Sequence, residues 1–362
     1  MVLGNKKISK GSNEYYIIAE IGISFYDIAE RFEIDPVTAA KIMIYQAAEA
    51  GADAIKFQIF KAERLTSDLK DLEFFSKRDK LKIEDYFELI KFCKKLNVTF
   101  AASLFDEELV EIFGPELSFF KIASPDLTYR PLIDKISKFQ KPILLSTGAS
   151  TSREIKWAIV RILKHPCEIV LMHCIASYPS MFDELHLGFI ERFLYPPIFN
   201  REELINIHGK YEIIPGYSDH AIFNKTILST AYVLGARVIE KHFTLNKDIE
   251  IDGKQGDHAH SMCPEDLKSL CKELDFIKKI IKTEPHYERQ LNKSEEPVRI
   301  YGRRSIFAKE NINENEKITY NNITYLRPGT GISPMSVNDI VGLKTLTKIE
   351  KGVMIDYSML KK

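Results

Sequence analysis

The sequence predicts a (β/α)8 barrel followed by a small C-terminal domain, and three observations support this prediction. Eight short apolar or β-branched runs recur before Ile281, helical patterns separate them, and the rhythm changes after that residue. Regular alternation of strand and helix is typical of a parallel sheet covered by helices, and eight repeats suit a closed barrel. A doubly wound open sheet is the alternative that the same pattern allows.

The eight predicted strands are short runs in which isoleucine, valine, leucine and phenylalanine are frequent, as expected for buried strands. They cover residues 17–22, 54–60, 99–103, 119–124, 143–147, 169–174, 213–219 and 238–243. The segments between them are long enough to return the chain so that consecutive strands run parallel.

Several of the intervening helices have clear start and stop signals. Asp35 precedes Pro36, which places a capping carboxylate before a proline at the first helical position, and Gly51 is a natural stop for this helix. Thr151 and Glu154 have the spacing of a capping box. A further helix is expected to begin near residue 264, where a proline is followed by two acidic residues.

The chain is expected to divide into residues 1–283, a barrel domain, and residues 300–362, a compact second domain. The intervening segment, 284–299, is polar, contains two prolines and has no hydrophobic periodicity, so we expect a linker there. After Tyr301 the sequence consists of short segments broken by turns.

Composition excludes several classes of protein. Lysine plus arginine (51) equals aspartate plus glutamate (51), which disfavours a general nucleic-acid binder because such proteins carry a basic excess. No apolar run approaches the roughly 20 residues needed to cross a bilayer, and the N-terminus does not resemble a signal peptide. The five cysteines are scattered and never spaced as C-x-x-C. We therefore expect a cytoplasmic protein with neither a nucleic-acid nor a membrane partner.

Polar side chains end most of the predicted strands, where a barrel interior otherwise holds branched apolar residues. Residues two apart on a strand face the same way, and three polar pairs have this spacing: Lys56 with Gln58, Ser218 with His220, and Glu240 with His242. The other strand-end residues are Glu20, Ser103, Lys121, Ser124 and Ser146. Buried ionisable groups are costly unless paired or bound to a ligand. Their convergence predicts a charged pocket at the C-terminal mouth of the barrel.

Each of these residues, taken alone, has a simpler interpretation. A strand-end serine is often a turn or cap residue, a single inward histidine is often a core residue, and a lysine can lie at a strand edge. Taken together, two lysines and several hydroxyls suit an anionic, phosphorylated ligand. His220 and His242 are candidate ligands for a divalent metal, and Glu20 and Glu240 are candidate acid–base groups. The sequence has no glycine-rich nucleotide loop.

The segments that carry these residues resemble the sialic acid (N-acetylneuraminate) synthase family. They are IIAEIGI, AAEAGADAIKFQ, FKIAS, PILLSTGAS, HCIASYP, GYSDH and ARVIEKHFTL, in this order. The C-terminal segments YGRRSIFAKENI, LRPGTGISP and VGLK resemble the antifreeze-like (SAF) domain that the family appends to its barrel. The resemblance extends over nearly the whole chain.

The resemblance implies a transferase of cell-surface sugar biosynthesis, which condenses phosphoenolpyruvate with an N-acylmannosamine-like hexosamine and water and releases phosphate. It implies that phosphoenolpyruvate is held by Lys56, Lys121, Ser103, Ser124, Ser146 and Ser218. It assigns Mn²⁺ or Mg²⁺ to His220 and His242, the sugar to Gln58, Tyr178 and Asp257, and the protons and attacking water to Glu20 and Glu240. It also implies a homodimer with swapped SAF domains, in which Arg327 reaches the N-acyl group of the sugar bound by a second subunit.

The sequence departs from the family pattern at positions expected to face the sugar. The first loop reads Ile-Ser-Phe-Tyr-Asp over 23–27 where the family has a polar Asn-His pair, and Ala176 replaces a frequent asparagine. The segment Gln-Gly-Asp-His over 255–258 replaces Gly-Pro-Asp-His and is followed by His260. His258 and His260 either contact the sugar, or support the side chains that bind the ligands, or belong to a solvated loop. We therefore expect an altered acceptor, either N-acetylmannosamine or a 2,4-diacetamido-2,4,6-trideoxyhexose.

Two other functions remain open at this point. A Schiff-base aldolase would use Lys56 or Lys121 as its nucleophile, would resist chelators and would be trapped by borohydride. A non-catalytic barrel whose SAF domain binds carbohydrate would release no phosphate.

Overall fold

The computed structural model describes residues 1–194, 213–251, 253, 255–281 and 289–361. The chain divides into two compact units, Met1–Lys282 and Thr283–Lys362. The first part of the expected linker, 284–288, lies outside the described residues. Its described part contains a 3-10 helix over Lys293–Glu295, and a turn of π-helix follows over Val298–Gly302.

Eight parallel strands close into a barrel in the first unit, in the order β10-β3-β4-β5-β6-β7-β8-β9. This confirms the predicted barrel and excludes the open sheet. The strands are β3 (Tyr16–Gly22), β4 (Ala54–Ile59), β5 (Thr99–Leu104), β6 (Phe120–Ile122), β7 (Ile143–Ser146), β8 (Ile169–Cys174), β9 (Ile213–Asp219) and β10 (Val238–His242). The barrel closes where β10 pairs with β3, in a register that sets Val238 beside Tyr16.

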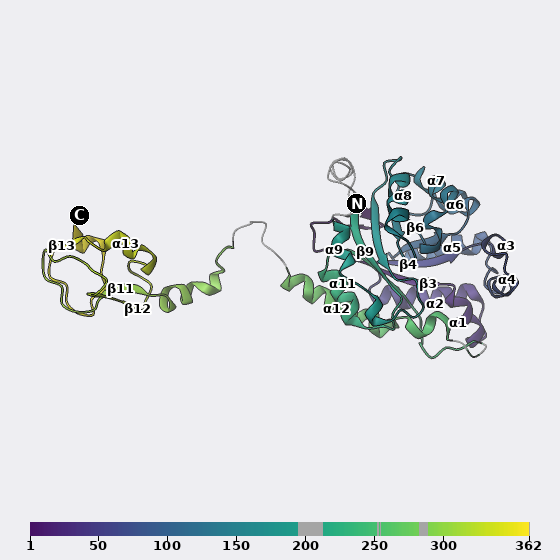
Figure 1. Ribbon diagram of the computed structural model, residues 1–362. Helices are drawn as coiled ribbons and strands as arrows, with labels where there is room; N and C mark the ends of the chain where they lie inside the picture. The colour runs from purple at the N-terminus through teal and green to yellow at the C-terminus, as the bar shows by residue number, and fades with distance from the viewer. Residues whose placement is uncertain (195–212, 252, 254, 282–288, 362) are drawn as a thin grey trace. The chain divides into compact units, whose positions relative to one another are not determined.

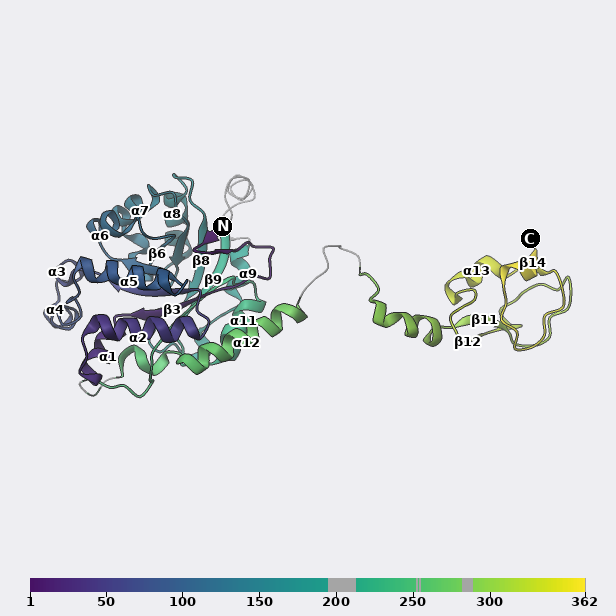
Figure 2. The same cartoon turned by 180° about the vertical axis from the view of Figure 1, so that it is seen from behind.

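Helices surround the strands on the outside of the barrel (Figures 1 and 2). They are α1 (Ser24–Phe32), α2 (Pro36–Glu49), α3 (Ala62–Leu65), α4 (Leu69–Ser76), α5 (Ile83–Lys95), α6 (Glu107–Phe113), α7 (Arg130–Ser137), α8 (Ser152–Ile162), α9 (Phe189–Leu194), α11 (Lys225–Val233) and α12 (Pro264–Ile280). The predicted start of α2 is confirmed, since the Asp35 side chain accepts a hydrogen bond from the Thr38 backbone. The capping box of Thr151 and Glu154 at α8 is also confirmed.

The interior of the barrel has two layers. At the N-terminal ends of the strands the inward side chains are apolar, and the hairpin of β1 (Val2–Leu3) and β2 (Lys6–Lys7) adds to this layer. Its members are Met1, Leu3, Ile8, Tyr16, Ile18, Ala54, Ala101, Phe119, Leu144, Val170, Met172, Ile214 and Val238. Two residues further along the same face the side chains become polar, as from Ile18 to Glu20 and from Val238 to Glu240. The apolar layer therefore supports a polar layer at the mouth.

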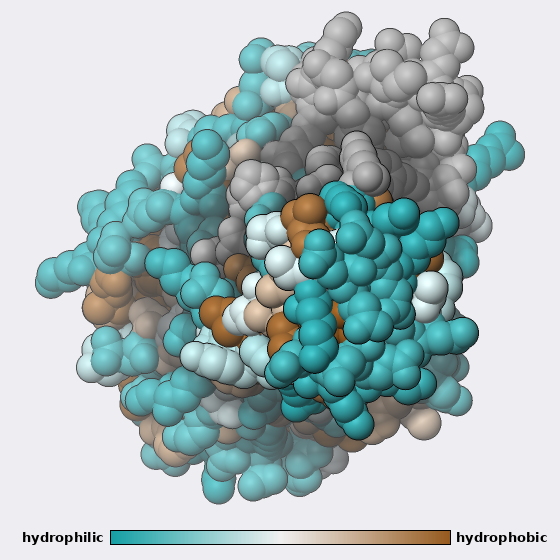
Figure 3. Space-filling view, turned by 90° about the vertical axis from the view of Figure 1, so that its left-hand side faces the viewer, coloured by the Kyte–Doolittle hydropathy of each residue, from teal (hydrophilic) through white to brown (hydrophobic). Residues whose placement is uncertain are grey.

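The second unit contains the antiparallel pairs β11 (Ser305–Ala308) with β12 (Ile323–Leu326) and β13 (Lys344–Thr345) with β14 (Leu360–Lys361), together with α13 (Val337–Ile340). Its core is small and consists mostly of isoleucine: Ile306, Ala308, Ile312, Ile318, Ile323, Ile332, Ile340, Ile349, Ile355 and Leu360. Hydrophilic residues cover most of the molecular face seen in Figure 3. In the part of the chain that the structure describes, every helix is too short or too polar to cross a membrane.

Candidate active site

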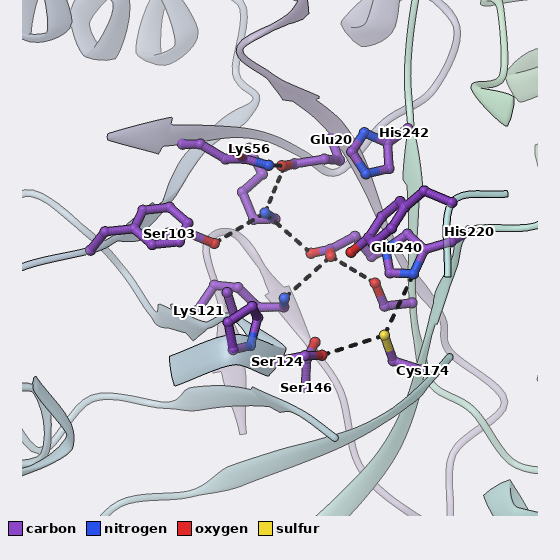
Figure 4. A pocket seen from close by; sticks show the side chains of 16 residues that line it. Glu20, Lys56, Ser103, Lys121, Ser124, Ser146, Cys174, His220, Glu240 and His242 are labelled. Atoms are coloured by element: carbon purple, nitrogen blue, oxygen red, sulfur yellow. Dashed lines mark hydrogen bonds and ion pairs between the residues drawn. The ribbon is translucent and has the colours of Figure 1, made fainter. Parts of the chain in front are cut away.

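A pocket lies at the C-terminal mouth of the barrel (Figure 4). It is lined by Glu20, Lys56, Gln58, Ser103, Phe105, Lys121, Ala123, Ser124, Pro125, Ser146, Cys174, Tyr178, Ser218, His220, Glu240 and His242. This lining includes every site residue predicted in the barrel domain except Asp257. The strand-end residues come together because each lies on the inward face of its strand, and inward faces converge at the mouth of a closed barrel.

Lys56 and Glu20 form one ion pair of the pocket, because the register of β4 and β3 sets them side by side. Lys56 Nζ lies 2.7 Å from Glu20 Oε2 and donates to Ser103 Oγ at 3.2 Å, and Gln58 Nε2 donates to Glu20 Oε1 at 3.0 Å. Burial alone would lower the pKa of Lys56, but Glu20 and Glu240 raise it above its usual value. Burial raises the pKa of Glu20, against the opposing effect of Lys56. Lys56 is therefore an ammonium group at neutral pH.

Glu240 is stabilised in its ionised form more strongly than Glu20. Its Oε1 lies 3.3 Å from Lys121 Nζ and accepts a hydrogen bond from Ser218 Oγ at 2.9 Å, while Oε2 lies 3.9 Å from Lys56 Nζ. Burial alone would raise the pKa of Glu240, but the two lysines and the serine hold it at about 2. Two carboxyl groups whose pKa values are moved in opposite directions, here Glu20 and Glu240, suit division into different acid–base roles.

The buried serines of the pocket differ in how far their hydroxyls are already hydrogen-bonded. Ser124 Oγ accepts a hydrogen bond from the Gly148 backbone at 3.0 Å. Ser146 Oγ is buried and has no hydrogen-bond partner among the described residues. A buried hydroxyl without a partner is costly, so Ser146 is a group that a ligand in this pocket would satisfy.

Sequence reasoning missed Phe105, Ala123, Pro125 and Cys174 among the lining residues. Cys174 is the most polar of them, and its Sγ lies 3.5 Å from Ser124 Oγ and 3.6 Å from His220 Nδ1. It lies two residues after the inward Met172 on β8. The spacing rule that selected the other strand-end residues would have selected Cys174 as well.

In the predicted metal pair, His220 directly follows β9 and His242 ends the adjacent strand β10, and their ring centroids are 5.6 Å apart. His220 Nδ1 donates to the backbone carbonyl of Ile175 at 2.8 Å. When the ring is neutral, its lone pair is therefore on Nε2. The Tyr178 ring lies 4.2 Å from that of His220, centroid to centroid.

His242 also faces two residues outside the predicted pair, Asp257 and His260. These three residues offer ligand atoms that all lie within 4.8 Å of one another. Burial lowers the pKa of His242 well below its usual value, and burial with the neighbouring His242 lowers that of His260 to about 3. Both rings therefore keep a lone pair at neutral pH. Two neutral imidazoles and a carboxylate are a donor set that divalent metals accept, so the residues fit a divalent cation.

The two segments in which the sequence departs from the family meet beside this site. Phe25 and Tyr26 are buried in the hydrophobic core, where Phe25 packs on Phe57, so they supply no polar group to the pocket. Asp27 follows them, and its carboxylate lies 2.6 Å from Arg78 and 3.4 Å from His258 Nε2. His258 therefore brings the segment that carries Asp257 and His260 next to α1.

A buried ion pair lies behind the histidine strands, on the faces that point away from the pocket. Asp219 Oδ2 lies 2.6 Å from Lys241 Nζ, and both side chains are 0% exposed. Tyr217 also donates to Asp219 Oδ1 at 2.8 Å. Because Asp219 precedes His220 and Lys241 precedes His242, this pair joins the backbones that carry the two histidines.

Arg327 belongs to the second unit, where it follows β12 and is exposed. Its predicted reach into the pocket of a second subunit stays a prediction.

Comparisons with known proteins place the chain among sugar-acid synthases. Residues 43–285 match the model of the NeuB family, and residues 303–361 match that of the SAF domain. The chain is 33% identical to the N,N'-diacetyllegionaminic acid synthase of Campylobacter jejuni, over 92% of this chain and 96% of the relative. It is 35% identical to an uncharacterized protein of Methanocaldococcus jannaschii, over 98% and 96% of the two chains. The structure of the N-acetylneuraminic acid synthetase of Leptospira borgpetersenii, in complex with citrate, has a TM-score of 0.67 at 29% identity, covering 82% of this chain and 94% of that one.

Proposed function

Because the chain belongs to the NeuB family and ends in a SAF domain, we propose that it condenses phosphoenolpyruvate with an N-acylated hexosamine to form a nonulosonic acid. In this reaction C3 of phosphoenolpyruvate forms a bond to the open-chain aldehyde carbon of the sugar. Water adds at C2, and the tetrahedral product expels inorganic phosphate by cleavage of the C–O bond. The reaction is a transfer of the EC 2.5.1 class.

The observation that carries the proposal is the group of two buried ammonium groups and four buried hydroxyls in one pocket. Among the described residues, Lys56 and Lys121 form their ion pairs with Glu20 and Glu240, which also face the pocket. A phosphate ester entering beside them would replace water around both cations, and charge-assisted hydrogen bonds are strong in such a setting. Ser146, with no partner of its own among the described residues, is placed to donate to the same anion.

The two glutamates are proposed to handle the protons. Glu240 is held as a carboxylate by Lys121 and can accept a proton from the water that adds at C2. Glu20, whose pKa is raised by burial, suits a group that gives a proton and takes it back. Gln58 holds one Glu20 oxygen in place and is proposed, with Tyr178 and Asp257, to contact the sugar.

A divalent cation, Mn²⁺ or Mg²⁺, is proposed to be held through His242, which belongs both to the predicted pair with His220 and to the group with Asp257 and His260. When bound, it would supply Lewis-acid polarisation of the aldehyde oxygen. The chain's own part is to offer imidazole nitrogens at the edge of the pocket, and burial lowers the pKa of His242 and of His260, which keeps these two rings neutral.

A Schiff-base aldolase is disfavoured by the electrostatics of the lysines. A nucleophilic lysine needs a lowered pKa to be a free amine, whereas the carboxylates raise the pKa of Lys56. Lys121 is also paired with a carboxylate, at 3.3 Å.

We propose a 2,4-diacetamido-2,4,6-trideoxyhexose as the acceptor in preference to N-acetylmannosamine. The name of the Campylobacter jejuni relative supports this choice. A second support is the altered first loop, whose aromatic residues are buried in the core. We further propose a cytoplasmic homodimer in which Arg327 of each SAF domain contacts the sugar bound by the other subunit.

The direct test is phosphate release from phosphoenolpyruvate in the presence of Mn²⁺, with a panel of acceptors. The panel contains N-acetylmannosamine, its 6-phosphate and the 2,4-diacetamido-2,4,6-trideoxyhexoses. We expect release with at least one member and loss of release with a chelator. Folded, metal-loaded protein that releases phosphate with no member would overturn the proposal, and trapping by borohydride would favour the aldolase.

A further inference from the structure

We propose that Asp257 and His260 complete, with His242, the divalent-cation site of this protein, a set of two histidines and one carboxylate. The predicted pair of His220 and His242 includes neither Asp257 nor His260. In this arrangement one carboxylate oxygen of Asp257 would bind the cation, and the other would remain for the proposed contact with the sugar. The inference rests on the proposed function, which gives the reason for a cation in this pocket, but its test measures binding without any substrate.

The distances suit a shared ion. His242 Nδ1 lies 3.6 Å from Asp257 Oδ2, and His260 Nε2 lies 3.8 Å from Asp257 Oδ1. Two ligand atoms that are each about 2.1 Å from one ion lie about 3 to 3.6 Å apart, depending on the angle at the metal. The observed separations are too long for hydrogen bonds, and they lie at and slightly above the upper end of this range.

The two nitrogens that face Asp257 have no hydrogen-bond partner in the part of the chain that the structure describes. His242 Nδ1 and His260 Nε2 are buried and, within the described ranges of the chain, make no hydrogen bond. His242 is 6% and His260 is 1% exposed. An unpaired buried polar atom costs free energy, and such atoms are expected to be satisfied by a group that the protein binds. Both nitrogens face the Asp257 carboxylate, so a single cation would provide a partner for His242, His260 and Asp257 together.

The local backbone holds the three residues in place without a ligand. Asp257 and His260 lie three residues apart in a 3-10 helix (Gly256–His260), where residues at this spacing fall on one side. The chain then returns to the end of β10, where the Met262 backbone donates to the His242 carbonyl at 2.8 Å. The three ligand residues are therefore connected by backbone hydrogen bonds as well as by sequence, which is the pre-organisation that a metal site needs.

His220 differs from His260 in its surroundings. Its Nδ1 donates to the Ile175 carbonyl, which leaves the lone pair of Nε2 available, and its ring lies against Tyr178. It is not among the three residues that bring their ligand atoms within 4.8 Å of one another. Among the histidines around His242, His260 therefore has the geometry of a direct partner in coordination.

The donor set defines the class of ion. Two imidazole nitrogens and one carboxylate suit Mn²⁺, Fe²⁺, Co²⁺ and Zn²⁺, whereas Mg²⁺ prefers oxygen ligands and retains its waters. Three protein ligands leave positions open for substrate oxygens on an ion that accepts six. We expect the protein to bind Mn²⁺ in preference to Mg²⁺.

The experiment is titration of the full-length protein with Mn²⁺ in the absence of substrate. The electron paramagnetic resonance signal of free Mn²⁺ measures how much of the ion is bound. The variants are His260→Gln and Asp257→Asn, which keep most of the side-chain volume. The matched control is His165→Ala, in the turn after α8. Removal of a ligand should weaken binding by at least the roughly tenfold to hundredfold seen for outer-shell partners. Electron spin-echo modulation should show one fewer coordinated nitrogen in His260→Gln.

The inference is supported if both variants bind Mn²⁺ at least tenfold more weakly while His165→Ala binds it like the parent. Unchanged Mn²⁺ affinity in either folded variant overturns it, and so does an unchanged nitrogen count in His260→Gln. If one variant does not fold, the other decides. Since no substrate is present, a failure of phosphate release with every sugar would leave this result unaffected, and the two proposals can fail separately.

Discussion

The two halves of the pocket differ in how well the protein satisfies its own charges. In the lysine–glutamate half, each ammonium lies within 3.3 Å of a carboxylate, and serine or glutamine side chains hydrogen-bond to the members. In the histidine half, His242 Nδ1 and His260 Nε2 are buried beside Asp257 with no hydrogen bond within the described chain. One half is balanced before any ligand enters, whereas the other lacks a positive charge.

This difference indicates what each half does. A balanced network keeps its side chains in place in the empty enzyme and exchanges partners when an anion arrives, so little reorganisation is needed. A group of buried nitrogens without hydrogen bonds instead carries a free-energy cost, which coordination of an ion would offset. The lysine–glutamate half is therefore pre-formed, and the histidine half would be completed by the proposed cation.

The largest expected effect comes from the buried pair behind the histidines. Asp219→Ala leaves Lys241 charged and unpaired in the core, which should lower the free energy of unfolding by about 3 to 5 kcal/mol. Urea denaturation measures the loss. The control is Glu14→Ala, which removes the partner of the half-exposed Lys278 and should cost at most about 1 kcal/mol. Equal losses in both variants would show that the histidine strands do not depend on the buried pair.

Removal of one ammonium should disrupt the balanced half. Lys121→Met takes away the cation beside Glu240 and one of two proposed phosphate ligands, so kcat/KM for phosphoenolpyruvate should fall by about a hundredfold to a thousandfold. Phosphate release at varied phosphoenolpyruvate concentration measures the fall. Lys138→Met, an exposed lysine after α7, should have no effect. Full activity of a folded Lys121→Met enzyme would show that Lys121 takes no part in the reaction.

The third prediction tests whether Arg327 of the second unit contributes to binding of the sugar. Arg327→Ala should raise KM for the sugar about tenfold, the scale of one charge-assisted hydrogen bond, and leave KM for phosphoenolpyruvate unchanged. Mixing the Arg327→Ala and Lys121→Met proteins tests the domain swap, since only a swapped heterodimer contains a pocket with both native residues. If mixing restores no activity after subunit exchange, Arg327 does not act across subunits.

The smallest effect is expected at Ser146, whose hydroxyl has no hydrogen-bond partner in the described chain. Ser146→Ala should raise KM for phosphoenolpyruvate about twofold to tenfold, the worth of one neutral hydrogen bond, without lowering the thermal midpoint. Ser218→Ala is the comparison, because its hydroxyl is already bonded to Glu240 and its loss should also alter the empty pocket. An unchanged KM in Ser146→Ala would mean that no ligand oxygen reaches this hydroxyl.

Much of the fold could be predicted because its signals are local. The strand runs, the cap at Asp35 and the capping box at Thr151 depend on neighbouring residues and needed no long-range information. The pocket lining was predictable for a related reason, since spacing by two decides which side of a strand a residue faces. Cys174 was missed, although it obeys the same spacing.

The group of His242, Asp257 and His260 was not predictable in this way. Asp257 and His260 lie on no strand, and their position depends on the bridge that returns the chain from the 3-10 helix to β10. The contact of Asp27 with His258, which joins two segments far apart in the sequence, has no local signal either.

The sequence by itself determined the strands, their inward polar ends and the charged residues of the lysine–glutamate half, because alternation along a strand is a property of the backbone. Only the tertiary structure decided that the sheet closes, through the pairing of β10 with β3, and that His260 and Asp257 lie beside His242. The closure of the barrel, and the return of the chain from the 3-10 helix to the end of β10, depend on contacts between residues far apart in the sequence. Their free energy depends on the packing of the whole unit and not on the pattern of any one segment.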